Sequence, residues 1–192
     1  MIFHRVQTRL VAAAKRLSGY GTARRLIRHE EGAAAIEFGL VAAPFLALVF
    51  AIMETAVIFF ASQALETAAA DSARLIMTGQ AQMQGFDQAK FKQEVCARVH
   101  GVFNCGASFF VDVKKYTSFA SISTDKPVDA GGNLQSDSFG YQPGGPGDIV
   151  VVRLMYQWPV YVSLLGLNLA DMSAGKRLLL STLAFRNEPY QN

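Results

Sequence analysis

The residues of this chain whose types and spacing could support chemistry begin with a glycine and a glutamate at the start of a long apolar run. Gly32 precedes the run, and Glu37 follows five positions later inside it. Hydrolysis of the peptide bond between Gly32 and Ala33 would leave a free amine on Ala33. That ammonium would stand four residues before the Glu37 carboxylate, on the same face of a helix. The two groups could then neutralise each other.

Glu37 needs such a compensating charge, because a carboxylate at the centre of a membrane segment costs about 2.5–3.5 kcal/mol, and less near an interface. An α-amino group has a reference pKa of about 7.7–8.0, so it is mostly protonated at neutral pH. It could pair with Glu37 within one chain or between neighbouring subunits, which would give Glu37 a role in subunit registry. The alternative is a Glu37 side chain that reaches the lipid interface without a partner.

The segment before Glu37 is a basic leader. A glycine followed five residues later by a glutamate, at the start of an apolar run, is the pattern that prepilin-type signal peptidases recognise. We therefore predict cleavage after Gly32 by a prepilin peptidase, with residues 1–32 as a cytoplasmic leader. Up to Glu31 the leader holds seven Lys/Arg against two acids. Positive charge marks the cytoplasmic flank of a membrane helix. A basic arm can also bind nucleic acid, but the adjoining apolar run favours the membrane.

Two cysteines, Cys96 and Cys105, fall in the part of the chain that this orientation places outside the cytoplasm. In an oxidising compartment such a pair is expected to form one disulfide that closes a short loop. The loop-entropy model gives such a bond roughly 2–3 kcal/mol. Two buried free thiols are the alternative. A metal site fits less well, because only His100 lies nearby and no third ligand has metal-site spacing.

No pattern typical of an active site occurs in the sequence. The chain has three histidines, and two of them lie in the leader. A nucleophile elbow, a Walker loop and a His-Glu-x-x-His helix are all missing from the sequence. The glycine-rich residues 142–147 lack the Lys-Ser/Thr of a phosphate loop and lead into a strand. The sequence therefore predicts a protein that is not an enzyme and that needs no cofactor or metal.

The elements that position these residues begin with a membrane helix. Residues 33–61 are almost wholly apolar, which exceeds the roughly 20 residues needed to cross the hydrocarbon core. We predict a single transmembrane helix over residues 33–62, in contact with the lipid bilayer. Pro44 removes one backbone hydrogen bond and should bend this helix near Leu40. Glu54 either lies near the opposite interface from Glu37 or pairs with a partner helix inside the membrane.

Helical spacing continues beyond the membrane over residues 63–80, and Gly79 is a plausible stop signal. Residues 81–192 are expected to form a periplasmic head with a helix at residues 86–99 and strands at residues 109–116, 149–158 and 176–186. Residues 118–147 are polar and rich in Gly and Pro, which predicts a disordered or loop segment. The predicted fold class is α+β: a long N-terminal hydrophobic helix that continues into a small antiparallel-sheet head, as in pilins.

Residues 160–169 form a short apolar stretch after Pro159. The stretch is too short to span a membrane. It either belongs to the core of the head or forms an exposed patch that touches the outer membrane leaflet or a partner subunit.

Three segments resemble a known family. Residues 31–54 (EGAAAIEFGLVAAPFLALVFAIME) look like the start of TadE-type proteins of the tight-adherence (Flp) pilus system. Residues 69–79 (AADSARLIMTG) are similar to a second block of that family, and residues 185–190 (FRNEPY) resemble its C-terminus. The pairing of Gly32 with Glu37 is common to pilin-like proteins, whereas the whole block of residues 31–54 is more specific.

The resemblance implies a minor pseudopilin of the bacterial inner membrane that helps to assemble or prime a pilus. It implies processing after Gly32 and a role for Glu37 in processing and assembly. As partners it implies other pseudopilins or pilins and the inner-membrane pilus platform. The residues alone leave open an uncleaved, signal-anchored periplasmic module that binds a ligand through residues 118–147.

Overall fold

The computed structural model describes residues 30–99, 101–161 and 168–190. The predicted leader therefore lies outside the described residues up to residue 29. The elements run in the order α3 (Glu30–Met77), α4 (Gln80–Met83), α5 (Gln88–Arg98), β1 (Phe109–Tyr116), β2 (Ile149–Pro159) and β3 (Lys176–Arg186). Short 3-10 turns lie at Phe119–Ser121, Ser136–Ser138 and Ser173–Gly175. The predicted α+β class, with a long apolar helix before an antiparallel sheet, is confirmed.

The helix α3 is continuous through Pro44. It begins at Glu30, three residues before the predicted start, and ends at Met77. Gly79, two residues further on, has a φ of 79°, a left-handed conformation that favours glycine and stops the helix. The chain divides into two compact units, Met1–Val49 and Phe50–Asn192. The first unit contributes an apolar helical segment, and the second contains the rest of α3 and the sheet.

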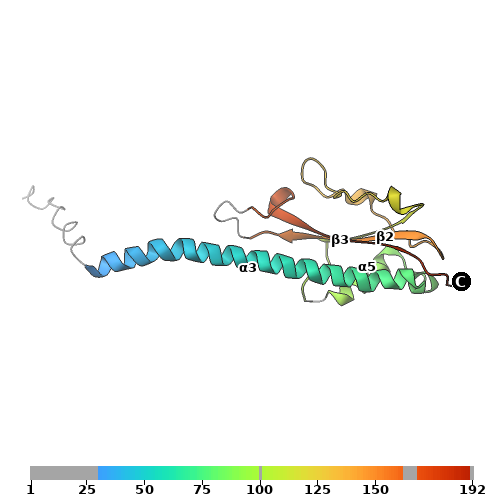
Figure 1. Ribbon diagram of the computed structural model, residues 1–192, viewed down its shortest axis with the longest axis horizontal. Coiled ribbons are helices and arrows are strands. Elements are labelled where there is room, and N and C mark those ends of the chain that lie inside the picture. Colours follow the sequence, from blue (N-terminus) through green and yellow to red (C-terminus); the bar gives the residue numbers. More distant parts are fainter. Residues whose placement is uncertain (1–29, 100, 162–167, 191–192) are drawn as a thin grey trace, which may run out of the picture. The chain divides into compact units, whose positions relative to one another are not determined.

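In the second unit, α3 has a buried face of small and apolar residues at helical spacing. Its fully buried members are Ala61, Leu65, Ala68, Ala69, Ser72 and Ile76. Alanines on this face let the sheet approach the helix closely. The face begins earlier than expected, because Ala51 and Ile58 are already buried. The head therefore packs on α3 within the stretch that the sequence assigned to the membrane (Figure 1).

The helix α5 completes this core. Asp87 caps its N-terminus by accepting the Lys90 backbone N–H at 2.7 Å, as expected of an aspartate at the N-cap. Phe91, Val95 and Val99 lie four residues apart on one face of this helix and are buried. The short helix α4 was not predicted, because four residues are too few to give a periodic pattern.

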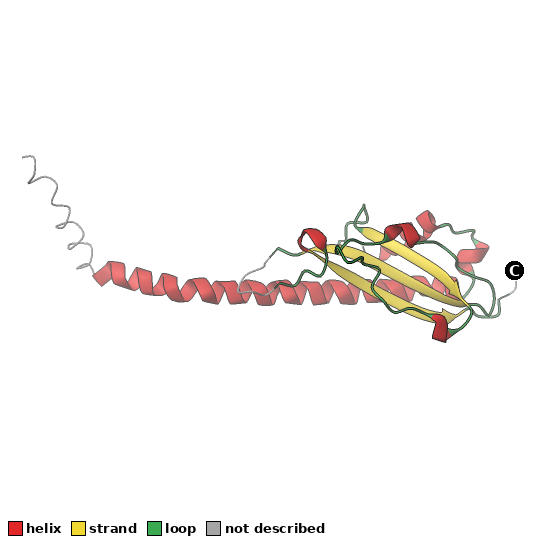
Figure 2. Ribbon diagram, turned by 90° about the horizontal axis from the view of Figure 1, so that it is seen from above, coloured by secondary structure: helices red, strands yellow, loops and turns green. Residues whose placement is uncertain are grey.

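The sheet has the order β1-β2-β3 and is antiparallel throughout the described residues. The register pairs Phe109 with Tyr156 and Tyr116 with Ile149 between β1 and β2. Between β2 and β3 it pairs Ile149 with Arg186 and Pro159 with Lys176. The predicted strands agree with these bounds to within one residue. Figure 2 shows the strands side by side over the helix.

The central strand β2 is buried on both faces. Val150, Val152, Leu154 and Tyr156 belong to the core that faces α3 and α5, as predicted. Residues of the opposite face are also buried: Ile149, Val151, Arg153 and Met155. Residues 118–147 cover this second face (Figure 1). A strand buried on both sides is expected to be an unbroken apolar run, and residues 149–152 are such a run.

Residues 118–147 are an irregular segment held by specific hydrogen bonds. The Arg153 guanidinium donates to the Ser123 carbonyl, and the buried Asp112 carboxylate accepts the Gly140 N–H at 2.9 Å. Tyr141 forms a parallel bridge with Val113 of β1. Of the two readings of this segment, disordered or loop, the structure shows a loop packed on the sheet.

The C-terminal residues close the end of the head at Gly79. The Glu188 N–H donates to the Met77 carbonyl at 2.8 Å, and the Tyr190 ring lies directly against Gly79. Asn187 is buried, and its amide donates to the carbonyls of Pro143 and Gly145, each at 2.9 Å. The end of α3, the glycine-rich loop and the C-terminal tail therefore meet in one place.

Replacing Gly79 with alanine should destabilise the head more than the same change at Gly85. Both glycines have positive φ, which costs a residue with a Cβ about 1–2 kcal/mol. A Cβ at Gly79 would also overlap the Tyr190 ring, whereas one at Gly85 would meet nothing within 4 Å. Urea unfolding of the detergent-solubilised chain measures both losses. Equal losses would show that the Tyr190 contact is unimportant.

Asp148 should make the head sensitive to acid. Its carboxylate accepts the Gly145 N–H at 2.7 Å and pairs with the Lys115 ammonium at 2.9 Å, and both contacts lower its pKa. Because the folded state prefers the ionised carboxylate, this stabilisation is full above the ordinary pKa of about 3.9. It is lost as the pH falls through the lowered folded-state pKa.

The measurement is the difference in free energy of unfolding between the natural chain and Asp148→Asn as a function of pH. We expect the natural chain to be the more stable at neutral pH. The two curves should begin to approach each other below pH of about 3.9, the ordinary pKa, and should meet once the pH is below the lowered folded-state pKa. A difference that stays constant into acid would show that the Asp148 charge does not contribute.

Candidate functional site

The exposed apolar surface of α3 is the largest candidate functional feature of the described residues. Its large exposed side chains lie on all sides of the helix in the first unit, and the most exposed of them are Ile36, Phe38, Leu40, Val41 and Phe45. By length and composition the stretch Ala34–Met77 can cross a membrane. A helix that is apolar all round is either buried or a membrane span, and these side chains are exposed.

Glu37 lies in this apolar surface and is exposed. In the described part of the chain, no hydrogen bond or ion pair involves its carboxylate. Gly32 is exposed within the first turn of α3, and a Cβ placed on it would meet nothing within 4 Å. The proposed cleavage point and Glu37 therefore lie on one continuous helix, with Glu37 open to a group from outside the described residues.

Glu54 is held inside its own chain. Its side chain is buried, and its Oε1 accepts the Tyr161 backbone N–H at 2.6 Å. This contact joins α3 to the segment that leaves β2 after Pro159. The sequence reading considered an interface position or a partner helix for Glu54 and missed Tyr161. A contact between residues 107 positions apart leaves no local pattern in the sequence.

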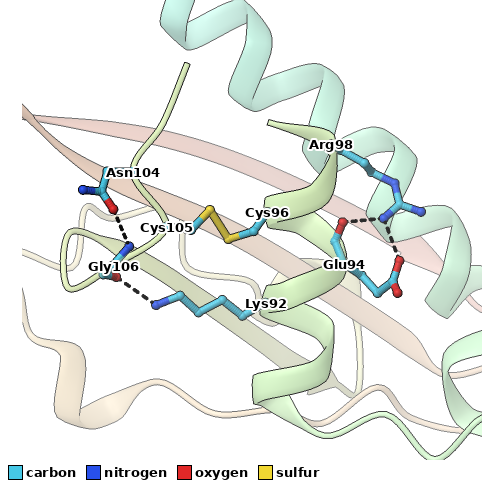
Figure 3. Close-up of a disulfide and its surroundings, with 7 residues drawn as sticks. All are labelled: Lys92, Glu94, Cys96, Arg98, Asn104, Cys105 and Gly106. Atoms are coloured by element: carbon cyan, nitrogen blue, oxygen red, sulfur yellow. Dashed lines mark hydrogen bonds and ion pairs between the residues drawn. A yellow bond between two sulfur atoms is a disulfide. The ribbon is translucent and has the colours of Figure 1, made fainter. Parts of the chain in front are cut away.

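The structure joins Cys96 and Cys105 in a disulfide (Figure 3). The bond connects the last turn of α5 to the segment before β1. Next to it the Lys92 ammonium donates to the Gly106 carbonyl at 3.1 Å, and the Asn104 side chain accepts the Gly106 N–H at 3.1 Å. Burial lowers the Lys92 pKa.

The loop that the disulfide closes carries Phe103 into an aromatic cluster. The Phe103 ring is buried and lies 4.8 Å from the Tyr156 ring and 6.2 Å from the Trp158 ring, between centroids. Edge-to-face pairs of this kind contribute about 0.5–1.5 kcal/mol beyond their buried area. The disulfide therefore fixes a loop whose side chain is part of the core, which is a structural role.

The described residues contain no group of three or more metal-ligating side chains. All three histidines, at positions 4, 29 and 100, lie outside the described residues. Burial and the Asp87 charge raise the pKa of Tyr141 to about 12. A phenol with that pKa stays protonated at neutral pH, so it is unsuited to proton transfer there.

One groove of about 300 Å³ lies between α3 and the outer edge of β3. It is lined by Ser62, Glu66 and Ala70 of α3 and by residues 180–183 of β3. Lys176 at the start of β3 forms a single bridge with Met172 on this edge. From Arg177 onward, no strand of the described chain pairs with this edge of β3. An open strand edge offers backbone N–H and C=O groups to another chain.

The comparison with known families concerns the helix. Residues 32–74 match the model of the TadE-like protein family, so this segment is TadE-like, and the resemblance seen in the sequence is confirmed over that range. No curated protein and no solved structure matches the chain. The match begins at Gly32, contains Glu37, Pro44 and Glu54, and ends before the close of α3. It does not cover the sheet, the disulfide or the C-terminal tail.

Reducing the disulfide should loosen the aromatic cluster without unfolding α3. We expect Cys96→Ser with Cys105→Ser to lower the free energy of unfolding of the head by roughly 2–3 kcal/mol. The near-ultraviolet circular dichroism of Tyr156 and Trp158 should weaken, and the helical signal should persist. Arg98→Gln is a matched control, because it leaves the disulfide in place and removes an exposed ion pair with Glu94, worth about 0–1 kcal/mol, and a hydrogen bond to the Glu94 carbonyl. Labelling of Cys96 and Cys105 in the natural chain without a reductant would show that the disulfide is not formed.

Proposed function

We propose that this protein is a minor pseudopilin: a membrane-anchored assembly subunit of a tight-adherence type pilus. The observation that carries the proposal is the coincidence of the TadE-like match, residues 32–74, with the exposed apolar surface of α3. TadE-like proteins are a structural and assembly family rather than an enzyme family. The subunit acts through packing of its helix and through contacts between proteins.

In this proposal the protein crosses the bacterial inner membrane once, with its N-terminus in the cytoplasm and its head in the periplasm. The basic leader supports this orientation, because Lys and Arg accumulate on the cytoplasmic side of membrane helices. The disulfide between Cys96 and Cys105 supports it independently, since disulfides persist in the oxidising periplasm.

Processing supplies the charge that Glu37 requires. A prepilin peptidase cuts between Gly32 and Ala33, and the new ammonium of Ala33 pairs with a Glu37 carboxylate of the same or a neighbouring subunit. The absence of a partner for Glu37 among the described residues supports an external one. An unpaired carboxylate in lipid is costly, so the subunit packs stably only where Glu37 is neutralised.

The partners of the proposed subunit are other pseudopilins or pilins and the inner-membrane pilus platform. Exposed apolar side chains of α3 supply a surface for helix packing within the membrane, and the open edge of β3 supplies a second surface on the head. Neither surface requires a cofactor.

The first test is the intact mass and N-terminal residue of the protein from membranes, with and without an active prepilin peptidase. We expect a mature chain that begins at Ala33 only when the peptidase is active. A chain that always retains its leader would contradict the pseudopilin proposal. It would favour an anchored module whose head binds a ligand.

The second test replaces Glu37 with glutamine in the same cells. Glu37→Gln should leave membrane insertion intact but reduce pilus assembly, processing or both, because the neutral side chain cannot pair with the Ala33 ammonium. The matched control is Asp71→Asn, which changes an exposed carboxylate of the same helix beyond the apolar surface and outside the groove at β3. Normal pilus formation with Glu37→Gln would show that the registry role is wrong.

A further inference from the structure

Between residues 50 and 60 the two sides of α3 face different surroundings. Ala51, Glu54 and Ile58 are buried against the head, whereas Phe50, Met53, Val57, Phe59 and Phe60 are exposed. The exposed side is as apolar as the span before it, with Phe59 68% exposed and Phe60 65% exposed. The head therefore covers one side of the helix at a level where the other side still has the character of a membrane surface.

The length of the span indicates where the outer boundary of the hydrocarbon falls. About 20 helical residues cross the hydrocarbon core. Counted from Ala34, where the candidate span begins, they end at Met53, one residue before Glu54. The Glu54 carboxylate is thus expected at the outer interface, where burial against the head and a backbone N–H replace its hydration.

Glu54 holds Tyr161 at the same level. The hydrogen bond from the Tyr161 N–H to Glu54 Oε1 measures 2.6 Å, so the backbone at Tyr161 lies directly beside α3. The Tyr161 side chain is 80% exposed, although tyrosine has a large apolar ring. A tyrosine with an exposed ring and hydroxyl is typical of the membrane interface, where one end of the side chain is in lipid and the other in water.

Two basic residues share this end of the sheet. Lys176 is paired with Pro159, and Arg177 with Trp158, across β2 and β3. The Lys176 ammonium donates to the Gln157 side-chain oxygen, and the Arg177 guanidinium donates to the Leu169 carbonyl, each at 3.1 Å. Both groups donate to neutral acceptors, but the Arg177 charge also acts on the nearby Asp171 carboxylate and lowers its pKa. No ion pair of the described residues involves Lys176, so its charge is the more available to lipid phosphates.

We propose that the end of the head formed by Tyr161, Lys176 and Arg177, which we name the interfacial end, is a second lipid contact of this protein. Tyr161 enters the interfacial region of the outer leaflet beside α3, and the two cations face anionic headgroups. Glu54 is the positioning residue that sets the depth of Tyr161. The inference rests on the proposed membrane anchoring of α3. It adds that the head itself lies on the bilayer in a defined orientation.

A lipid surface is the occupant that the observations favour over a protein. Phe50, Met53 and Val57 lie within four residues of Glu54 along α3 and are exposed, so the interfacial end is at the level of apolar side chains that need a lipid environment. An aromatic residue flanked by cations at the boundary of an apolar helix is the composition of an interfacial anchor.

Depth-dependent quenching of tryptophan by brominated lipids tests the proposal. The chain has one tryptophan, Trp158, so Trp158→Phe provides a silent background. Single tryptophans are then placed at Tyr161, at Phe45 in the span and at Phe119. Phe119 is the control, because it is also exposed but follows β1 at the opposite end of the sheet from Pro159. The full chain is reconstituted in vesicles of phosphatidylethanolamine and phosphatidylglycerol.

We expect Tyr161→Trp to lose emission with bromines placed near the headgroups, and Phe45→Trp to lose emission with bromines placed deep in the acyl chains. Phe119→Trp should keep its emission. Adding Glu54→Ala to Tyr161→Trp should change the quenching depth, whereas Glu54→Gln, which keeps an oxygen acceptor, should preserve it.

Three results would overturn the inference, and they are distinguishable. Quenching at Phe45 without quenching at Tyr161 would leave the anchor intact and reject the interfacial end. Equal quenching at Tyr161 and Phe119 would indicate a head without defined orientation. No quenching at Phe45 would reject the membrane anchor, and the inference with it. Quenching of the native Trp158, three residues from Tyr161, can also be measured in the unmodified chain. Agreement between the two measurements would show that the variants are folded like the natural protein.

Discussion

The structure depends on one helix that must satisfy two surroundings. Along the second unit, one side of α3 forms one wall of the core of the head, and it does so largely with small residues such as Ala61, Ala68 and Ala69. The opposite side stays apolar and exposed as far as Phe60. The buried surface is needed for the fold, and the exposed surface has the length and composition of a membrane span.

At the two ends of the sheet, the head is held by contacts outside the packing on α3. The apolar side chains of α3 are divided between the core and the exposed surface, so other contacts must hold the ends of the sheet. At one end the disulfide carries Phe103 into the aromatic cluster with Tyr156 and Trp158. At the other, Asn187 of the C-terminal tail donates to the glycine-rich loop, and the Glu188 N–H donates to the Met77 carbonyl at the end of α3. The carbonyls that Asn187 satisfies would otherwise be costly to bury.

Much of the fold was predictable because its signals are local. Alternation and turn residues located β1, β2 and β3, and helical spacing located α5 and the length of α3. The covered outer face of β2 was missed, although the apolar residues 149–152 already carried the signal of a strand buried on both sides. The contacts of Glu54 with Tyr161 and of Asn187 with the loop join distant parts of the chain, so no periodicity or spacing could reveal them.

The two carboxylates of α3 show how similar residues acquire different roles. Both Glu37 and Glu54 interrupt an apolar helix, and the sequence alone cannot separate them. The structure does, because Glu54 is buried and accepts a backbone N–H from its own chain, whereas Glu37 is exposed. A carboxylate already bound inside its subunit has little to gain from a neighbour. In the proposed subunit, the residue that requires an external positive charge is therefore Glu37, whereas Glu54 contacts the backbone of its own head.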